Sequence, residues 1–327
     1  MTTGATGEAG RRLAVSRARG RRMDVAGAVA SLLLLLAVGG FTLALTTPYD
    51  YVEHALVAQR WHDGLSQPPP HFFYELLVVA VHDVWSAASW ERAGKLVALV
   101  FYALLGAVLF AVWRRRTAPS GAGADAGAGP RLAAAVIAAP ALALAAPVFL
   151  LTVADRNLYV GYVAADAYHN PTIVVLRPLA LLLFLLVVEA LDGERAASLP
   201  ALAGIAVLSG LGAFAKPNYA LAFVPALVAV CALRWRAGRS LRLDVVSAVV
   251  APLLVVLPVE LVLYRHLGTG GGFTLDPLGP LRIDATLFDH GAYTSAGWVL
   301  VKLVLSVPTA LAVTALAFRE VARDTAM

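Results

Sequence analysis

Long runs of apolar residues alternate with short polar segments along most of this chain. A helix needs roughly 20 mostly apolar residues to cross about 30 Å of hydrocarbon, because no backbone polar group can stay unpaired in lipid. The pattern therefore predicts an all-α, polytopic transmembrane helix bundle of about 8 spans. The predicted spans are 25–46, 93–113, 132–153, 172–191, 199–215, 219–233, 245–264 and 298–318.

Composition agrees with this pattern. The chain is 60% hydrophobic and 14% charged, whereas soluble domains are about 45 to 50% apolar and about 25% charged. The first apolar run is longer than the usual 7 to 15 residues of a cleaved signal peptide and lacks a small-residue cleavage site, which favours an uncleaved anchor. Cys231 is the single cysteine, so neither an internal disulfide nor a cysteine-based metal site can form.

Basic residues predict the orientation of the spans, since short loops that retain Lys and Arg are cytoplasmic. Placing the N-terminus inside puts 17 of the 26 Lys and Arg residues on one side. We therefore expect a multi-pass protein of the cell membrane, in contact with the lipid bilayer. We expect no nucleic-acid partner, because the basic residues have no interleaved aromatic residues and form no known binding motif. The predicted cytoplasmic parts are the tails 1–24 and 319–327 and the Gly/Ala-rich linker 117–130, and the outer loops are 47–92, 154–171 and 265–297.

Residues 71–90 also contain an apolar core, but a crossing there would place the basic run 114–116 outside. The charge rule therefore predicts an interfacial helix that does not cross. Glu75 and His82 recur between apolar residues, as in a helix lying in the interface with its polar edge toward water.

Ionisable residues gather in the first outer loop, directly after the first span. Asp50 and Glu53 are three residues apart, so a helical turn places both carboxylates on one face, and His54 lies beside them. His71 and Glu75 follow in the segment "PPPHFFYELL", where the prolines stiffen the chain. Such groups at a membrane edge lose solvation unless they face a cavity or a partner. The alternative interpretation is a solvated loop start with a helix cap.

The second outer loop, 154–171, also contains several polar and ionisable residues, and two isolated basic residues follow it in the sequence. Arg177 lies near the start of a span and Lys216 lies between two spans, and each needs an anion, either a carboxylate or a ligand phosphate. The alternative for both is snorkelling toward lipid headgroups. The polar residues of this loop that we predict to contact substrate are Asp155, Asp166, His169 and Asn170.

The combination of a basic N-terminus, a first span followed by Asp50, a long first outer loop, "PPPHFFYELL" and a span ending in "RRR" resembles the membrane glycosyltransferases of the GT-C superfamily. The resemblance implies a polyprenyl-phosphate-linked sugar as donor and a lipid or cell-envelope acceptor. It implies that Asp50 is the catalytic base or a metal ligand, with Glu53 as the second candidate. Where the family has paired acids, this chain has only Asp-x-x-Glu.

The chemistry of such a transfer matches the residue types. A base deprotonates the acceptor hydroxyl and a cation stabilises the departing phosphate. Asp50 fits the first role, and Arg177 and Lys216 fit the second. His54, His71 and His169 either orient the acceptor or, with Asp50, hold a divalent cation such as Mg or Mn.

Two other classes stay open. Carboxylates and cations at span edges also suit a secondary transporter or a lipid-carrier flippase, and a non-catalytic membrane assembly protein needs no site at all. Transporters concentrate such groups near the bilayer midplane and often show repeated halves, whereas these spans are nearly free of charge at their centres, apart from Glu189 and Glu260 near span ends.

Overall fold

The structure is a computed structural model, and it is all-helical over the part of the chain that it describes. Five helices in that part are long and apolar enough to cross a membrane, and two shorter apolar helices accompany them. This confirms the predicted all-α class, with five candidate membrane spans among the described residues, whereas the predicted count of about 8 spans stays a prediction. The described residues are 23–41, 43, 49–69, 71–117, 128–144, 170–193 and 196–266.

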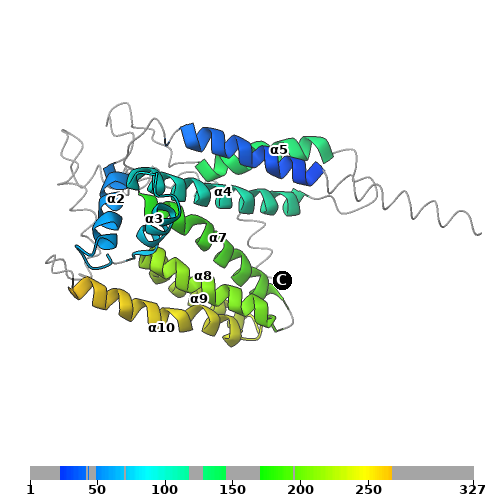
Figure 1. Ribbon diagram of the computed structural model, residues 1–327. Helices are drawn as coiled ribbons and strands as arrows, with labels where there is room; N and C mark the ends of the chain where they lie inside the picture. The colour runs from blue at the N-terminus through cyan, green and yellow to red at the C-terminus, as the bar shows by residue number, and fades with distance from the viewer. Residues whose placement is uncertain are drawn as a thin grey trace, which may run out of the picture. The chain divides into compact units, whose positions relative to one another are not determined.

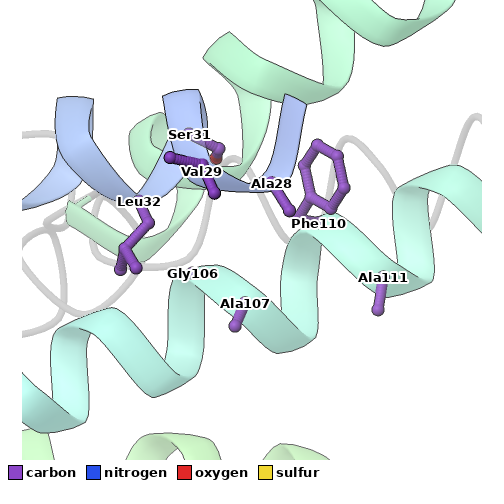
Figure 2. Close-up of a pocket in the computed structure, with 8 residues that line it drawn as sticks. All are labelled: Ala28, Val29, Ser31, Leu32, Gly106, Ala107, Phe110 and Ala111. Carbon is purple, nitrogen blue, oxygen red and sulfur yellow. The ribbon is translucent and has the colours of Figure 1, made fainter. Parts of the chain in front are cut away.

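The chain divides into two compact units, and the division falls within one long helix, α4 (Trp90–Thr117). The first unit combines helix Met23–Phe41, the part of α4 from Leu99 onward, and α5 (Ala128–Leu144). In this unit Phe110 packs with Ala135 and Ala139 of α5. An apolar cavity of about 310 Å³ lies between helix Met23–Phe41 and α4 (Figure 2), and its lining includes Ser31, Gly106 and Phe110.

The second unit holds α2 (Tyr49–His62), α3 (Phe73–Val84) and a bundle of four helices. Within the bundle, α8 packs most extensively against α10 and α7. Both α2 and α3 contact α7, and α3 also contacts α8 (Figure 1). Its apolar core includes Leu183, Ile205, Leu227 and Val249, one from each helix. The four helices are α7 (Pro171–Asp192), α8 (Leu199–Ala215), α9 (Pro217–Arg236) and α10 (Leu243–His266).

Local sequence explains why these helices begin and end where they do. Asn170 caps α7, since its Oδ1 accepts the N–H groups of Thr172 at 3.1 Å and Ile173 at 3.3 Å. Lys216 is extended, with φ −166° and ψ 106°, because the residue before a proline is disfavoured in the helical region. Pro217 then starts α9, where its missing N–H costs nothing.

The predicted helix 71–90 is wrong in its bounds. The helix observed there is α3, Phe73–Val84, which at 1.5 Å per residue is about 18 Å long and so too short to cross about 30 Å of hydrocarbon. A new helix starts at Trp90 because Ser89 Oγ accepts the N–H of Arg92 at 3.3 Å. The predicted absence of a crossing is therefore supported by length, while the predicted position in the interface stays a prediction.

Other bounds also differ. The predicted linker 117–130 is shorter than expected, because α4 continues to Thr117 and α5 begins at Ala128. The α5 helix has 17 residues, fewer than the predicted span 132–153, whose last part lies outside the described residues. The predicted span 298–318 and the outer loop 265–297 lie outside them almost entirely.

Candidate functional site

Ionisable side chains from separate segments of the second unit meet at one end of the four-helix bundle. We call this group the acidic end. The bundle end is formed by the start of α7, the junction of α8 with α9 and the last turns of α10, with α2 and α3 lying there (Figure 1). The acidic end consists of the ionisable residues Asp50, His54, His71, Glu75, Lys216 and Glu260, together with Thr172, whose hydroxyl accepts a hydrogen bond from Lys216.

Glu75 of α3 is bonded to α2 through His54. It is 1% exposed, and its Oε1 is hydrogen-bonded to Nδ1 of His54 on α2. Tyr74 meets the ring of His54 edge-on, with ring centroids 5.6 Å apart. Burial, reinforced by the charge of Glu75, raises the pKa of the Tyr74 hydroxyl well above its ordinary value. Tyr74 therefore stays neutral at physiological pH.

His71 and Glu260 connect the α3 entry to α10. The backbone N–H of His71 donates to Oε2 of Glu260 at 2.6 Å, and Glu260 is 2% exposed. His71 has a φ of 47°, which is uncommon for a residue with a side chain. Burial, with smaller contributions from the positive charge of Lys216 and from the His54 ring, lowers the pKa of the His71 imidazole to about 4. The imidazole is therefore neutral at pH 7.

Lys216 provides the cation of the acidic end. Its Nζ donates to Oγ1 of Thr172 at 3.4 Å, near the N-terminus of α7. Burial lowers the pKa of Lys216, and the carboxylate of Asp50 opposes that effect. Asp50 and Lys216 are therefore close enough to interact electrostatically, although they are far apart in the sequence.

The predicted site residues fall into three groups. The first group, Asp50, His54, His71, Glu75 and Lys216, meets at the acidic end. The second group is described but placed differently: Glu53 is exposed, Asn170 serves as the cap of α7, and Arg177 is half-buried, five residues beyond Thr172 or about 7.5 Å along the helix. The third group, Asp155, Asp166 and His169, lies outside the described residues.

Glu260 is the residue that the sequence analysis missed as part of this group. Its signal was an ionisable residue inside an apolar span, which by default marks a functional position. Its proximity to His71 depends on how α10 packs against α8, and that packing has no local sequence signature.

A metal site has no support within the described residues. Among them, no group of three or more His, Cys, Asp or Glu side chains is arranged to hold a metal ion. The predicted Mg or Mn cofactor stays a prediction, because His169, one of its candidate ligands, lies outside the described residues.

Comparison with known proteins adds no assignment. No family model, no curated protein and no solved structure matches this chain.

Proposed function

We propose that this chain is a membrane glycosyltransferase that moves a sugar from a polyprenyl-phosphate donor to a lipid or cell-envelope acceptor. The observation that carries the proposal is the proximity of Asp50 to Lys216, a carboxylate and an ammonium at a partly buried bundle end. A carboxylate that can accept a proton, beside a cation that can hold a phosphate, is the pair that such a transfer requires.

In the proposed reaction an acceptor hydroxyl attacks the anomeric carbon of the sugar. The new C–O bond forms as the bond from that carbon to the phosphate oxygen breaks, and the polyprenyl phosphate leaves with the electron pair. Asp50 accepts the hydroxyl proton, and Lys216 stabilises the departing phosphate. Arg177, further along α7, is the second candidate for the phosphate contact. No step is routed through a metal ion.

The remaining polar groups orient the acceptor in this proposal. The ring of His54, one helical turn from Asp50 on α2, is held by Glu75, and the backbone of His71 is held by Glu260. Fixed positions matter because orientation supplies a large share of catalysis.

Assay of the purified protein in lipid nanodiscs with a panel of radiolabelled polyprenyl-phosphate sugars tests this function. We expect transfer by the wild type and its loss in Asp50→Asn. Asp63→Asn is the matched control, because Asp63 is an exposed carboxylate just beyond α2. Lys216→Met should raise the KM for the donor, whereas Lys95→Met, which removes only an ion pair with Glu91, should not. If Asp50→Asn transfers sugar as fast as the wild type, Asp50 only stabilises the first turn of α2.

A transporter is the second candidate, and the buried carboxyl groups of Glu75 and Glu260 favour it, since ionisable groups inside a membrane often mark ion pathways. Counterflow of a labelled substrate into sealed vesicles, without chemical conversion, would support that class. Transfer to an acceptor without any counterflow would exclude it.

A further inference from the structure

Glu75 and Glu260 are two buried carboxyl groups whose hydrogen bonding is incomplete. They come from α3 and α10 and are 1% and 2% exposed. Each has one oxygen in a hydrogen bond, Oε1 of Glu75 with His54 and Oε2 of Glu260 with the N–H of His71. The other oxygen of each is buried and finds no partner among the described residues. The two groups are also close enough to interact electrostatically.

The charges around this pair are unevenly distributed. Glu75 has the ring of His54, which can carry a positive charge, and Asp50 has Lys216. Glu260 has only a backbone N–H and the ring of His71, whose Nδ1 is 4.0 Å away. That ring is neutral at pH 7, because burial lowers the pKa of His71 to about 4. Within the described part of the chain, therefore, no cationic side chain faces Glu260.

An ionised Glu260 would be unfavourable for two reasons. A buried carboxylate without a cationic partner loses its solvation without replacement. A second carboxylate nearby adds repulsion, so two such groups do not both ionise in a poorly solvated site. One bound proton removes both penalties.

We propose that Glu260 is a proton-binding site that keeps one proton at neutral pH. Because Oε2 accepts the N–H of His71, the proton belongs on Oε1, the oxygen that has no partner among the described residues. The ligand of the site is a proton and not a metal cation, in keeping with the absence of a metal-ligating group among the described residues. This inference does not depend on sugar transfer and holds for either class of function.

The bound proton also affects the contact between the α3 entry and α10. With Glu260 neutral, its hydrogen bond with His71 joins the α3 entry to the last turns of α10. When the proton leaves at high pH, the charge of Glu260 adds electrostatic repulsion with Glu75. The Gln variant of Glu260 keeps an oxygen for the N–H of His71 but has no charge at any pH, so it mimics the protonated state.

Infrared difference spectroscopy of the protein in nanodiscs tests the proposal, because the C=O stretch of a protonated carboxyl group differs from that of a carboxylate. At pH 7 we expect this band in the wild type and its loss in Glu260→Gln. Glu53→Gln, which removes an exposed carboxyl group of α2, should keep the band. The proposal is overturned if wild type and Glu260→Gln have the same spectrum in this region, or if only Glu75→Gln loses the band. It is also overturned if sodium chloride removes the band at constant ionic strength, since the site then takes a metal cation.

Chemical labelling of the wild type provides a second measurement, which does not require that Glu260→Gln folds. An apolar carbodiimide adds to a protonated carboxyl group: the acid proton moves to a carbodiimide nitrogen, and the O-acylisourea rearranges to a stable N-acylurea. Mass spectrometry should place this adduct on Glu260 at pH 7, with less adduct as the pH rises. An adduct on Glu75 with none on Glu260 overturns the assignment.

Discussion

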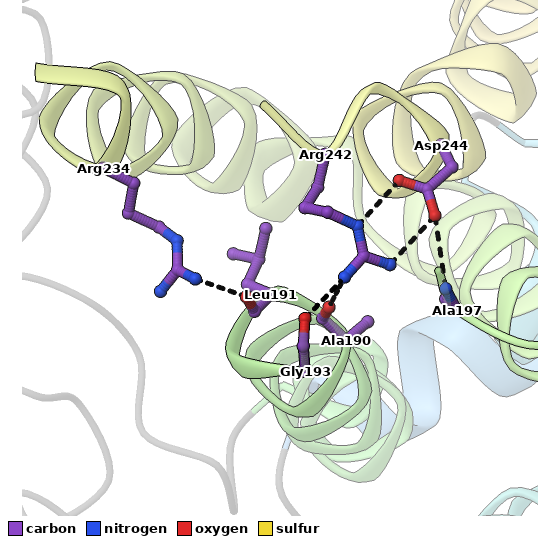
Figure 3. Close-up of polar contacts among 7 residues, drawn as sticks. All are labelled: Ala190, Leu191, Gly193, Ala197, Arg234, Arg242 and Asp244. Atoms are coloured by element: carbon purple, nitrogen blue, oxygen red, sulfur yellow. Dashed lines mark hydrogen bonds and ion pairs between the residues drawn. The ribbon is translucent and has the colours of Figure 1, made fainter. Parts of the chain in front are cut away.

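Charged side chains are paired differently at the two ends of the four-helix bundle. The end away from the acidic end, which we call the arginine end, contains Arg234, Arg242 and Asp244 (Figure 3), together with Asp192 at the C-terminus of α7. Arg242 is 9% exposed and donates to both carboxylate oxygens of Asp244, at 3.1 and 2.9 Å. Its Nη1 also donates to the carbonyls of Ala190 at 2.6 Å and Gly193 at 3.0 Å, at the C-terminus of α7.

The difference between these ends separates a structural polar cluster from a functional one. At the arginine end a cation meets the carbonyls that a helix C-terminus leaves without intrahelical partners, and a carboxylate balances its charge. At the acidic end Glu75 and Glu260 each keep a buried carboxyl oxygen without a partner among the described residues, whereas at the arginine end the corresponding atom is Nε of Arg234, whose other nitrogens are bonded. Incompletely paired ionisable groups are characteristic of sites that bind or react. We therefore expect mutations at the acidic end to change activity and mutations at the arginine end to change stability.

The comparison predicts first that the two ends lie on opposite sides of the membrane. The α7 helix, with 22 residues, is about 33 Å long, enough to separate them by the hydrocarbon core. In a Cys231→Ser background, a cysteine at exposed Ser66 should react with an impermeant maleimide in intact cells, and one at exposed Ser240 should not. Ser240 lies in the short loop before Arg242, in the segment that the basic residues place inside. The reverse labelling pattern would invert the orientation of the whole chain.

The second prediction concerns the rate of sugar transfer. Loss of a general base costs about 10² to 10⁴ in rate, so Asp50→Asn should reduce kcat by that factor and leave the thermal unfolding temperature nearly unchanged. Because the charge of Asp50 opposes the lowering of the Lys216 pKa, this variant should also lose donor affinity at a lower pH than the wild type. Steady-state kinetics across pH measure both effects. A fall in stability with an unchanged kcat would place Asp50 with the structural residues.

The third prediction concerns the arginine end. Arg242→Ala leaves the carbonyls of Ala190 and Gly193 without their donor and Asp244 without its partner. Hydrogen bonds to charged groups contribute about 1.5 to 3 kcal/mol each, so the free energy of unfolding should fall by about 2 to 3 kcal/mol. Arg236→Ala is the control, since Arg236 is exposed. Urea or thermal unfolding in detergent measures the change, and the kcat of the folded fraction should equal that of the wild type.

The fourth prediction tests how tightly α3 packs on α4. A Cβ at Gly94 would lie 2.5 Å from the hydroxyl oxygen of Tyr74, which is fully buried. Overpacking of this kind costs about 1 to 3 kcal/mol, so Gly94→Ala should lower the free energy of unfolding by that amount. At Gly204, by comparison, the nearest atom is a Leu186 methyl group at 3.5 Å, an ordinary contact. Gly204→Ala should therefore be neutral or stabilising, because alanine favours the helix. Equal effects of the two variants would mean that Tyr74 can move aside.

The smallest effect is expected at His62, which is exposed at the end of α2. Its hydrogen bond with Asp63 raises the pKa of the His62 imidazole, and the charge of Asp83 adds to the effect. Since the pKa is higher in the folded state, the stabilisation is complete below the ordinary value of about 6.5 and disappears as pH rises through the raised value. The unfolding temperature of the wild type should therefore decline slightly as the pH rises above about 6.5, and this decline should be smaller in His62→Gln. A steeper decline in the variant would contradict the assignment.

Part of the acidic end was accessible from the sequence because ionisable residues stand out against apolar runs. Asp50, His54, His71, Glu75 and Lys216 were each identified in this way, from their position at a span edge. Asn170 was interpreted as a substrate contact, but an Asn before Pro171 is also a strong helix cap, and the structure gives it that role. The sequence could not distinguish these roles, because both place a polar side chain directly before a helix.

The sequence by itself determined the local features of this protein: the helical class, the apolar runs and the break between α8 and α9 at Lys216 and Pro217. These features depend on residue types within a few positions of one another, so they can be read along the chain. The tertiary structure decided which distant residues meet, above all that Glu260 of α10 bonds the backbone of His71. It also decided that Arg242 donates to the backbone carbonyl of Ala190 near the C-terminus of α7. Such pairings depend on the register and packing of helices far apart in the sequence, and no local pattern specifies them.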